Sequence, residues 1–319
     1  MQVSTYEDLT FVVQGPIIHD DEGNVTLRCI DSIRKWYPSS SIVLSTWTDP
    51  GQLEHVDVLV NEDPGPIQTQ DVFYKNYNRM MKSTAAGMAI VKTRYAAKIR
   101  SDFWFRHFYP ILEVYRNEGT ITEKWCHLLK GRIMMCMQEA HYRLHPYYPS
   151  DWFNCGHTED MRKLWHGLLV PPVYSAQIPN FWGRLLYSSL GCGNQFASMD
   201  HPLHSEQQLC IDFLRNLGLQ ITYSNVRQST LRDLLAGYRL LGELFMVIPR
   251  YELGLISSKH ATPKCEKDLY VWDLAVNQNS DPYGIRLLIA VLGPYLAAEA
   301  EEKRKSLICA LRKWLGRLK

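Results

Sequence analysis

The chain has 319 residues, of which 46% are apolar and 21% are charged, so it carries enough nonpolar surface for a large core. This composition excludes a disordered segment, and a formal charge of only +2 argues against a protein that binds nucleic acid. The first ten residues lack the basic and apolar regions of a secretory signal, and the longest apolar run, Leu287 to Ala298, is too short to cross a bilayer, so we expect a cytoplasmic protein.

Eight cysteines lie scattered along the chain without a C-x-x-C pair. This spacing suits neither a zinc site nor a disulfide framework, so we expect reduced cysteines in the core. They are Cys29, Cys126, Cys136, Cys155, Cys192, Cys210, Cys265 and Cys309.

The first hundred residues alternate between strand and helix patterns. A short apolar run from Leu9 to Gln14 ends at a Gly-Pro turn. Apolar residues then recur at helical spacing from Leu27 to Trp36 until Pro38 stops the pattern, and Ile42 to Trp47 returns to strand composition. The order predicts a βαβ unit with parallel strands and a helix across them.

Two further strands and a helix follow. Valines alternate between Val56 and Val60 before a turn cluster, and Phe73 to Ala86 has helical spacing. From Tyr95 to Arg100 the pattern has period two, and Asp102 follows at once. Ligands of open α/β sheets bind at the carboxyl ends of strands, so Asp102 is predicted to meet a ligand. The same aspartate also suits the N-cap of a helix that begins at Phe103.

The rest of the chain is less regular. Arg132 to Met137 has strand composition, whereas four prolines between residues 146 and 172 predict loops around them. Ser205 and Gln208 match a capping box, which predicts a helix through Leu214. The later part is mostly helical, with one strand predicted from Leu244 to Ile248. We therefore divide the chain into residues 1–215 and a mostly helical region, 216–319.

The last segment, residues 303–319, combines an apolar helical stripe with seven basic residues and no acid. Such a basic amphipathic helix either docks on its own domain or lies on anionic lipid headgroups.

Several common motifs are absent, among them the phosphate loop, the H-E-x-x-H zinc motif and the G-x-S-x-G elbow. Gly191 and Gly193 begin a dinucleotide-binding fingerprint, but Phe196 stands in the place of its third glycine. The carboxylate of Asp102 therefore remains as the main signal. One hard carboxylate suits Mn²⁺ or Mg²⁺, because one or two protein oxygens and substrate phosphates usually hold these ions.

Eight short segments follow one another in a distinctive order. They are VVQGPI (Val12 to Ile17), SIRKWYP (Ser32 to Pro38), LSTW (Leu44 to Trp47), NEDPG (Asn61 to Gly65), NYNR (Asn76 to Arg79), KIRSD (Lys98 to Asp102), PSDWF (Pro149 to Phe153) and SEQQL (Ser205 to Leu209). This ordered set resembles the WavE-type lipopolysaccharide synthesis family over about residues 8 to 215. The resemblance implies a bacterial cell-surface polysaccharide enzyme, a glycosyltransferase with a GT-A-like (Rossmann-like) α/β nucleotide-sugar domain.

Enzymes of the GT-A fold hold a metal ion and the donor diphosphate on an Asp-x-Asp triplet at a strand end. Here the triplet is Arg100-Ser101-Asp102, with arginine in the first acidic place. The resemblance implies that Asp102 is a metal ligand and that His260 completes the metal shell. Arg100 offers an alternative, because its charge offsets phosphate charge without a metal.

The resemblance also implies contacts to the nucleotide. The turn of Gln14, Gly15 and Pro16 would meet it through the backbone, Asp63 would contact the base or ribose, and Arg79 would meet the diphosphate. Each residue has an ordinary alternative, since Gly and Pro end strands, Asp caps turns and helical arginines are usually solvated.

Glycosyl transfer needs a carboxylate that takes the proton of the acceptor hydroxyl. Inverting GT-A enzymes place this base at a helix N-terminus, which by resemblance points to Glu206. An acid there also simply complements the helix dipole. Asp151 is the competing base or a ligand of the acceptor hydroxyls, because sugar sites pair carboxylates with aromatic faces, and it also suits a loop cap over Trp152.

The predicted function is transfer of a sugar from a nucleotide diphosphate donor to a lipopolysaccharide, O-antigen or capsule glycan, with Mn²⁺ or Mg²⁺. The expected partners are the nucleotide-sugar, a glycan or lipid-linked glycan acceptor and an anionic surface of the inner membrane, without nucleic acid. A non-catalytic glycan- or nucleotide-binding component of an assembly complex is the alternative, supported by the missing first aspartate. A phosphotransferase with the same clamp is the third hypothesis.

Overall fold

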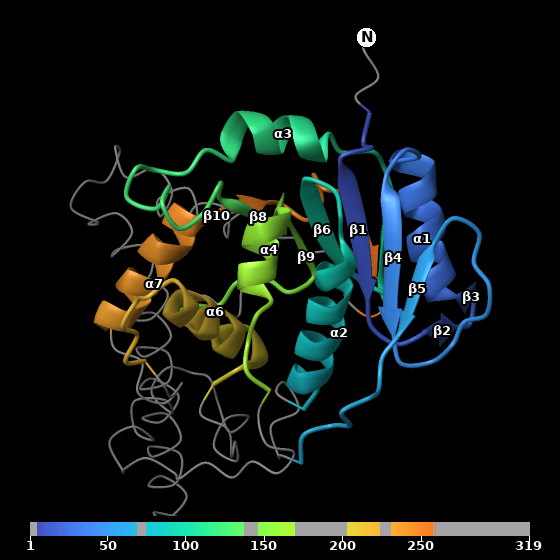
Figure 1. Ribbon diagram of the computed structural model, residues 1–319, viewed down its shortest axis with the longest axis horizontal. Coiled ribbons are helices and arrows are strands. Elements are labelled where there is room, and N and C mark those ends of the chain that lie inside the picture. The colour runs from blue at the N-terminus through green and yellow to red at the C-terminus, as the bar shows by residue number, and fades with distance from the viewer. Residues whose placement is uncertain are drawn as a thin grey trace, which may run out of the picture.

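The protein is a mixed α/β structure around a seven-stranded sheet (Figure 1). The computed structural model describes residues 5–68, 75–136, 146–169, 203–223, 231–257 and 259. Across the sheet the strand order is β10-β8-β9-β6-β1-β4-β5. In that order the strands are Phe245–Ile248, Ile133–Cys136, Phe153–His157, Tyr95–Arg100, Leu9–Gln14, Ser41–Thr46 and Asp57–Val60.

The sheet is parallel except for one strand. β1 pairs in parallel with both β4 and β6, β4 with β5, and β10 with β8. β9 is antiparallel to its neighbours β6 and β8. The carboxyl ends of six strands and the amino end of β9 therefore lie along one edge of the sheet, an arrangement consistent with a Rossmann-like fold.

The βαβ unit predicted at the start of the chain is confirmed. Asn24 caps α1 (Val25–Trp36) by accepting a hydrogen bond from the N–H of Leu27, and the helix ends just before Pro38. The strand predicted from Tyr95 to Arg100 is β6 with the same bounds. The helix predicted from Phe73 to Ala86 is α2, which spans Tyr77–Ile90 and so ends four residues later than expected.

Both faces of the sheet are covered, which explains why its strands have continuous apolar runs rather than alternating ones. In β1, Val12 packs with α2, α4 (Thr158–Leu164) and α6 (Ser205–Asn216) on one face. Phe11 and Val13 pack on the other face with α1 and α3 (Ile111–Glu118). Figure 1 shows the same layers, and α7 (Leu231–Leu244) lies beyond α6.

Two short ladders flank the sheet. β2 (His19–Asp20) pairs with β3 (Gly23–Asn24), and β7 (Phe103–Phe105) pairs with β11 (Leu255–Ser257), in both cases antiparallel. Asp102 is therefore followed by a strand, and the prediction that it caps a helix is wrong.

The middle of the chain is more regular than its prolines suggested, since β9 begins four residues after Pro149 and α4 follows β9 directly. The capping pair of α6 also lies one residue earlier than predicted. The N-cap is His204, whose backbone N–H donates to Oε1 of Gln207 at 3.2 Å. Four of the five described cysteines are buried and none is in a disulfide, whereas Cys126 is exposed, contrary to its expected core position.

The strand predicted near Leu244 is confirmed as β10, and it joins the sheet of the first part beside β8. The division at residue 216 stays a prediction, but any unit that begins there shares this sheet. The basic segment 303–319 and His260 lie outside the described residues. Within the described ranges, no helix has both the length and the apolar character needed to cross a membrane.

Candidate active site

The edge of the sheet where β1 and β6 end brings the Gln14-Gly15-Pro16 turn against the Arg100-Ser101-Asp102 triplet. The backbone N–H of Ser101 donates to the carbonyl of Gln14 at 2.9 Å, and its hydroxyl donates to the carbonyl of Pro16 at 2.8 Å. The parallel register of the two strands puts these segments side by side although 85 residues separate Pro16 from Ser101. Two sequence-predicted elements of the site are thus adjacent.

Gly15 is required for this contact. Its φ is +134°, and a Cβ there would lie 2.5 Å from Oγ of Ser101. We expect Gly15→Ala to lower the free energy of unfolding by about 2–4 kcal/mol, because the backbone strain and the clash add. Gly23→Ala is the matched control, since Gly23 has a φ of +118° but open space around its Cβ position. Equal losses in urea unfolding of the two variants would show that the contact with Ser101 is unimportant.

Asp102 is clasped by Arg100. Nε and Nη2 of Arg100 donate to the two carboxylate oxygens of Asp102 at 2.9 and 2.8 Å. Asp102 is only 2% exposed, whereas the side chain of Arg100 keeps 28% of its surface in solvent. Nζ of Lys259 lies 3.5 Å from Oδ2 of Asp102 on the exposed side. The buried carboxylate therefore holds two cations at the edge of the sheet.

Asp151 joins the same cluster from the loop just before β9. Because β9 runs antiparallel to β6, its amino end lies beside the carboxyl end of β6. Oδ2 of Asp151 is therefore close to Arg100, at 3.5 Å from its Nη1. The loop is fixed by Ser150, whose hydroxyl accepts from the N–H of Trp152 at 3.3 Å and contacts Sγ of Cys136 at 3.4 Å. Asp151 is thereby placed beside the Arg100–Asp102 pair.

Lys98 supports Asp151 from below the edge. Its side chain is fully buried, and its Nζ donates to the carbonyl of Asp151 and lies 3.8 Å from Oδ2 of the same residue. The ammonium group also lies 4.9 Å from the ring centre of Trp165. Burial lowers the pKa of Lys98 to about 8, although the carboxylate of Asp151 acts in the opposite direction.

Glu206 approaches the cluster from the first turn of α6. Burial, followed by the charge of Asp151, raises the pKa of Glu206 to about 7, while a hydrogen bond with Tyr148 and the charge of Arg100 act against this rise. Its Oε2 is buried and has no hydrogen-bond partner among the described residues. An acceptor atom left in this state is rare in a folded protein, which marks Glu206 as a candidate for a functional role.

The charges of the cluster are mutually dependent. Burial acts to lower the pKa of Arg100, but Asp151, Asp102 and Glu206 together raise it above its usual value, so the guanidinium stays charged. The predicted site residues in this cluster are Arg100, Asp102, Asp151 and Glu206. The turn at Gly15 adjoins the cluster.

Asp63 and Arg79 form a separate pair on the same edge. Nε and Nη2 of Arg79 donate to Oδ1 and Oδ2 of Asp63 at 2.8 and 2.5 Å, and this hydrogen bonding lowers the pKa of Asp63. Asp63 follows β5, which is three strands from β6, a lateral distance of roughly 14 Å. The two residues are thus placed toward the far end of any ligand that begins at Asp102.

The described residues do not fit a divalent metal ion at Asp102. Both of its carboxylate oxygens accept hydrogen bonds from Arg100, and Lys259 adds a second positive charge. In the described part of the chain, no three His, Cys, Asp or Glu side chains come together as a metal site. The prediction that Mn²⁺ or Mg²⁺ acts here stays a prediction, and we derive no step through it.

A family model described as WavE lipopolysaccharide synthesis matches residues 9–284. The chain belongs to the WavE family. The match includes every described residue of the cluster and extends well past residue 215, so the WavE region contains β10 and β11 as well as the first part. Lipopolysaccharide synthesis is therefore the process in which the family places this protein. A search of curated proteins found no match.

Three residues of the cluster were not singled out from the sequence. Lys98 and Lys259 contact the acids, and the guanidinium of Arg250, which is 2% exposed, lies 5.2 Å from the ring centre of Trp152 beside Asp151. Lys98 had a usable signal, because a lysine inside an apolar strand needs a buried partner. Arg250 and Lys259 had none, since only tertiary structure brings them here.

Proposed function

We propose that the protein is a glycosyltransferase of lipopolysaccharide synthesis, with the GT-A-like mode of donor binding, and that Glu206 is its general base. The observation that carries the proposal is the buried Oε2 of Glu206, which has no hydrogen-bond partner in the described part of the chain and belongs to a carboxyl group with a pKa of about 7. A base with a pKa near the working pH is the most effective at proton transfer.

In the proposed reaction the acceptor hydroxyl donates its hydrogen bond to Oε2 of Glu206. Its oxygen attacks the anomeric carbon of the donor sugar, the bond from that carbon to the diphosphate oxygen breaks, and the proton passes to Glu206. The nucleoside diphosphate leaves with the bonding electrons. This single displacement inverts the anomeric centre and needs no covalent intermediate.

The departing diphosphate needs positive charge near it. Arg100 keeps part of its surface in solvent although Asp102 binds its Nε and Nη2, and Lys259 is more than half exposed beside the same aspartate. We propose that these two cations meet the diphosphate and that the Gly15 turn lies against the nucleotide. The Asp63–Arg79 pair is then a candidate for contacts to the ribose or base.

Calorimetric titration with UDP, GDP and CMP, each with Mn²⁺ and with EDTA, tests donor binding. We expect one nucleoside diphosphate to bind, and Lys259→Gln to weaken that binding about tenfold through loss of a charged contact. Lys124→Gln is the matched control, because Lys124 is also more than half exposed and lies 2.8 Å from the carboxylate of Glu243, away from both Asp102 and the Asp63–Arg79 pair. Absence of binding to all three nucleotides would overturn the proposed donor site.

Measuring the release of nucleoside diphosphate from the sugar donor distinguishes the proposed glycosyltransferase from the two alternative functions. Tight nucleotide binding without turnover, in the presence of lipopolysaccharide fragments as acceptors, would favour the non-catalytic binding component. Cleavage at phosphate rather than at the anomeric carbon would favour a phosphotransferase. We also propose that the protein lies on the anionic surface of the inner membrane and that the basic segment 303–319 binds this surface.

A further inference from the structure

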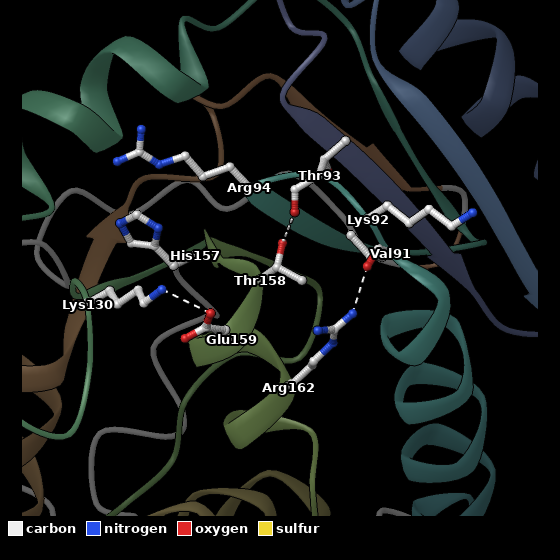
Figure 2. Close-up of a pocket in the computed structure, with 9 residues that line it drawn as sticks. All are labelled: Val91, Lys92, Thr93, Arg94, Lys130, His157, Thr158, Glu159 and Arg162. Atoms are coloured by element: carbon white, nitrogen blue, oxygen red, sulfur yellow. Dashed lines mark hydrogen bonds and ion pairs between the residues drawn. The ribbon is translucent and has the colours of Figure 1, made fainter.

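A polar cavity lies at the opposite end of β6 from the candidate active site. It has a volume of about 330 Å³ and lies where β6 begins, β9 ends and α4 begins (Figure 2). Arg94 and Arg100 are separated by the length of β6, roughly 20 Å. The lining residues are Val91, Lys92, Thr93, Arg94, Lys130, His157, Thr158, Glu159 and Arg162.

The cavity carries an excess of positive charge. Four cations and one carboxylate line it, which gives a net charge of +3 with His157 neutral. Among the described residues Lys92 has no hydrogen-bond or ion-pair partner. Lys130 pairs with Glu159 at 2.9 Å, but both side chains are more than half exposed, and such surface pairs exchange partners at little cost.

The backbone around the cavity is held in place. Nε and Nη2 of Arg162 donate to the carbonyls of Met88 and Val91 at 3.0 and 2.7 Å, which ties the end of α2 to α4. The N–H of Thr158 donates to the carbonyl of Arg94 at 3.0 Å. Oδ2 of the buried Asp160 accepts from the N–H of Lys130 at 2.8 Å. The backbone segments that carry these cations are therefore held together by hydrogen bonds.

The pKa of His157 reflects the positive charge around the cavity. Figure 2 shows its ring on the same side of the cavity as Arg94 and Lys130. Burial lowers the pKa of His157, and the charges of Arg94 and Lys130 lower it further, against the carboxylate of Glu159. These three charged residues are the groups of the cavity whose charges act on the ring.

We propose that this cavity is a second anion site, separate from the donor site, that binds a phosphate-bearing group through Arg94 and Lys130. Arginine and lysine bind phosphate through charge-assisted hydrogen bonds, and a volume near 300 Å³ admits a diphosphate together with part of the group that carries it. The source of the phosphate is either a lipid headgroup or a soluble phosphorylated molecule.

Titration of the full-length protein with inorganic pyrophosphate, followed by NMR of the histidine ring signals, tests the site. We expect pyrophosphate to bind and to raise the pKa of His157, whose signal is assigned by its loss in His157→Asn. Arg94→Gln should weaken this binding about tenfold. Arg116→Gln is the matched control, because both arginines lie over the ring of Tyr95, at 5.3 and 5.5 Å, and only Arg94 lines the cavity.

Two further arms distinguish the source of the phosphate. Flotation with vesicles of phosphatidic acid in phosphatidylcholine, reduced by Arg94→Gln but not by Arg116→Gln, identifies a lipid headgroup. Binding of pyrophosphate without flotation identifies a soluble phosphate group. The proposal is overturned when neither probe binds, or when Arg94→Gln and Arg116→Gln bind equally well. Donor binding at Lys259 is measured independently, so failure here leaves the proposed function standing.

Discussion

Glu206→Gln is expected to remove sugar transfer while making the protein more stable at pH 8. The amide cannot accept the proton of the acceptor hydroxyl, and loss of a general base lowers the rate by about 10²–10⁴-fold. Gln keeps the shape of Glu, so nucleotide binding should persist within a few-fold. A variant that transfers sugar within tenfold of the wild-type rate would exclude Glu206 as the base and leave Asp151 as the next candidate.

The stability effect follows from the raised pKa. The pKa of Glu206 is 4.5 when unperturbed and about 7 in the fold, so between these values the native state binds more protons than the unfolded chain. Stability from this group is therefore lost as the pH rises through that range, and at pH 8 a buried carboxylate is ionised. We expect Glu206→Gln to gain on the order of 1–3 kcal/mol at pH 8 and little at pH 4.5 in urea unfolding.

Asp212→Asn is the control for both measurements. Asp212 lies on the same helix, and burial raises its pKa as well, but it accepts hydrogen bonds from Tyr77 and Gln208 away from the cluster. This variant should keep the transfer rate. The activity profile of the wild type should rise with pH through about 7, and Asp151→Asn should move that rise to lower pH, because the charge of Asp151 raises the pKa of Glu206.

Asp102→Ala is expected to cost about 2–4 kcal/mol of unfolding free energy, because it removes the carboxylate that is hydrogen-bonded to Nε and Nη2 of Arg100. The remaining contact to Asp151 and the partial solvent exposure of Arg100 keep the loss at the lower end of the range for broken buried pairs. Adding Arg100→Met to Asp102→Ala should recover at least half of the lost stability in urea unfolding, since no unpaired charge remains.

Failure of the second substitution to restore stability would show that the two side chains do not act as a pair. The pairing of Arg100 with Asp102 also affects how activity data are interpreted. Loss of transfer in Asp102→Ala alone does not assign Asp102 to the chemistry, because the substitution also frees the guanidinium that we place against the diphosphate. Transfer rates must therefore be compared between Asp102→Ala and the double variant at temperatures where both are folded.

Local sequence patterns predicted the first half of the sheet well. Leu9–Gln14 and Tyr95–Arg100 were correct to the residue, because the first is an apolar run that a Gly-Pro turn ends and the second is a period-two pattern that runs into a charged triplet. The clasp between Arg100 and Asp102 was not predicted, because it depends on the turn that Ser101 and Asp102 form after β6.

The other half of the site depended on nonlocal pairing. Nothing near Asp151 indicates that β9 runs against β6, and this direction alone brings Asp151 to the edge where Asp102 lies. The prolines around Asp151 correctly predicted irregular chain before it, but they also led us to expect a loop where β9 forms. Glu206 was found because a helix start is a local signal, although its electrostatic interaction with Asp151 and its raised pKa arise from tertiary packing.

The position of β10 has a consequence for folding of the chain. β8 consists of Ile133 to Cys136, four buried residues, and β10 is its outer neighbour in the sheet, although more than a hundred residues separate the two strands in sequence. Until Ile248 has been synthesised, β8 presents an unpaired and apolar strand edge, which is the kind of surface that recruits other chains. The sheet is thus completed late, and nascent chains shorter than about 250 residues carry the greatest risk of aggregation.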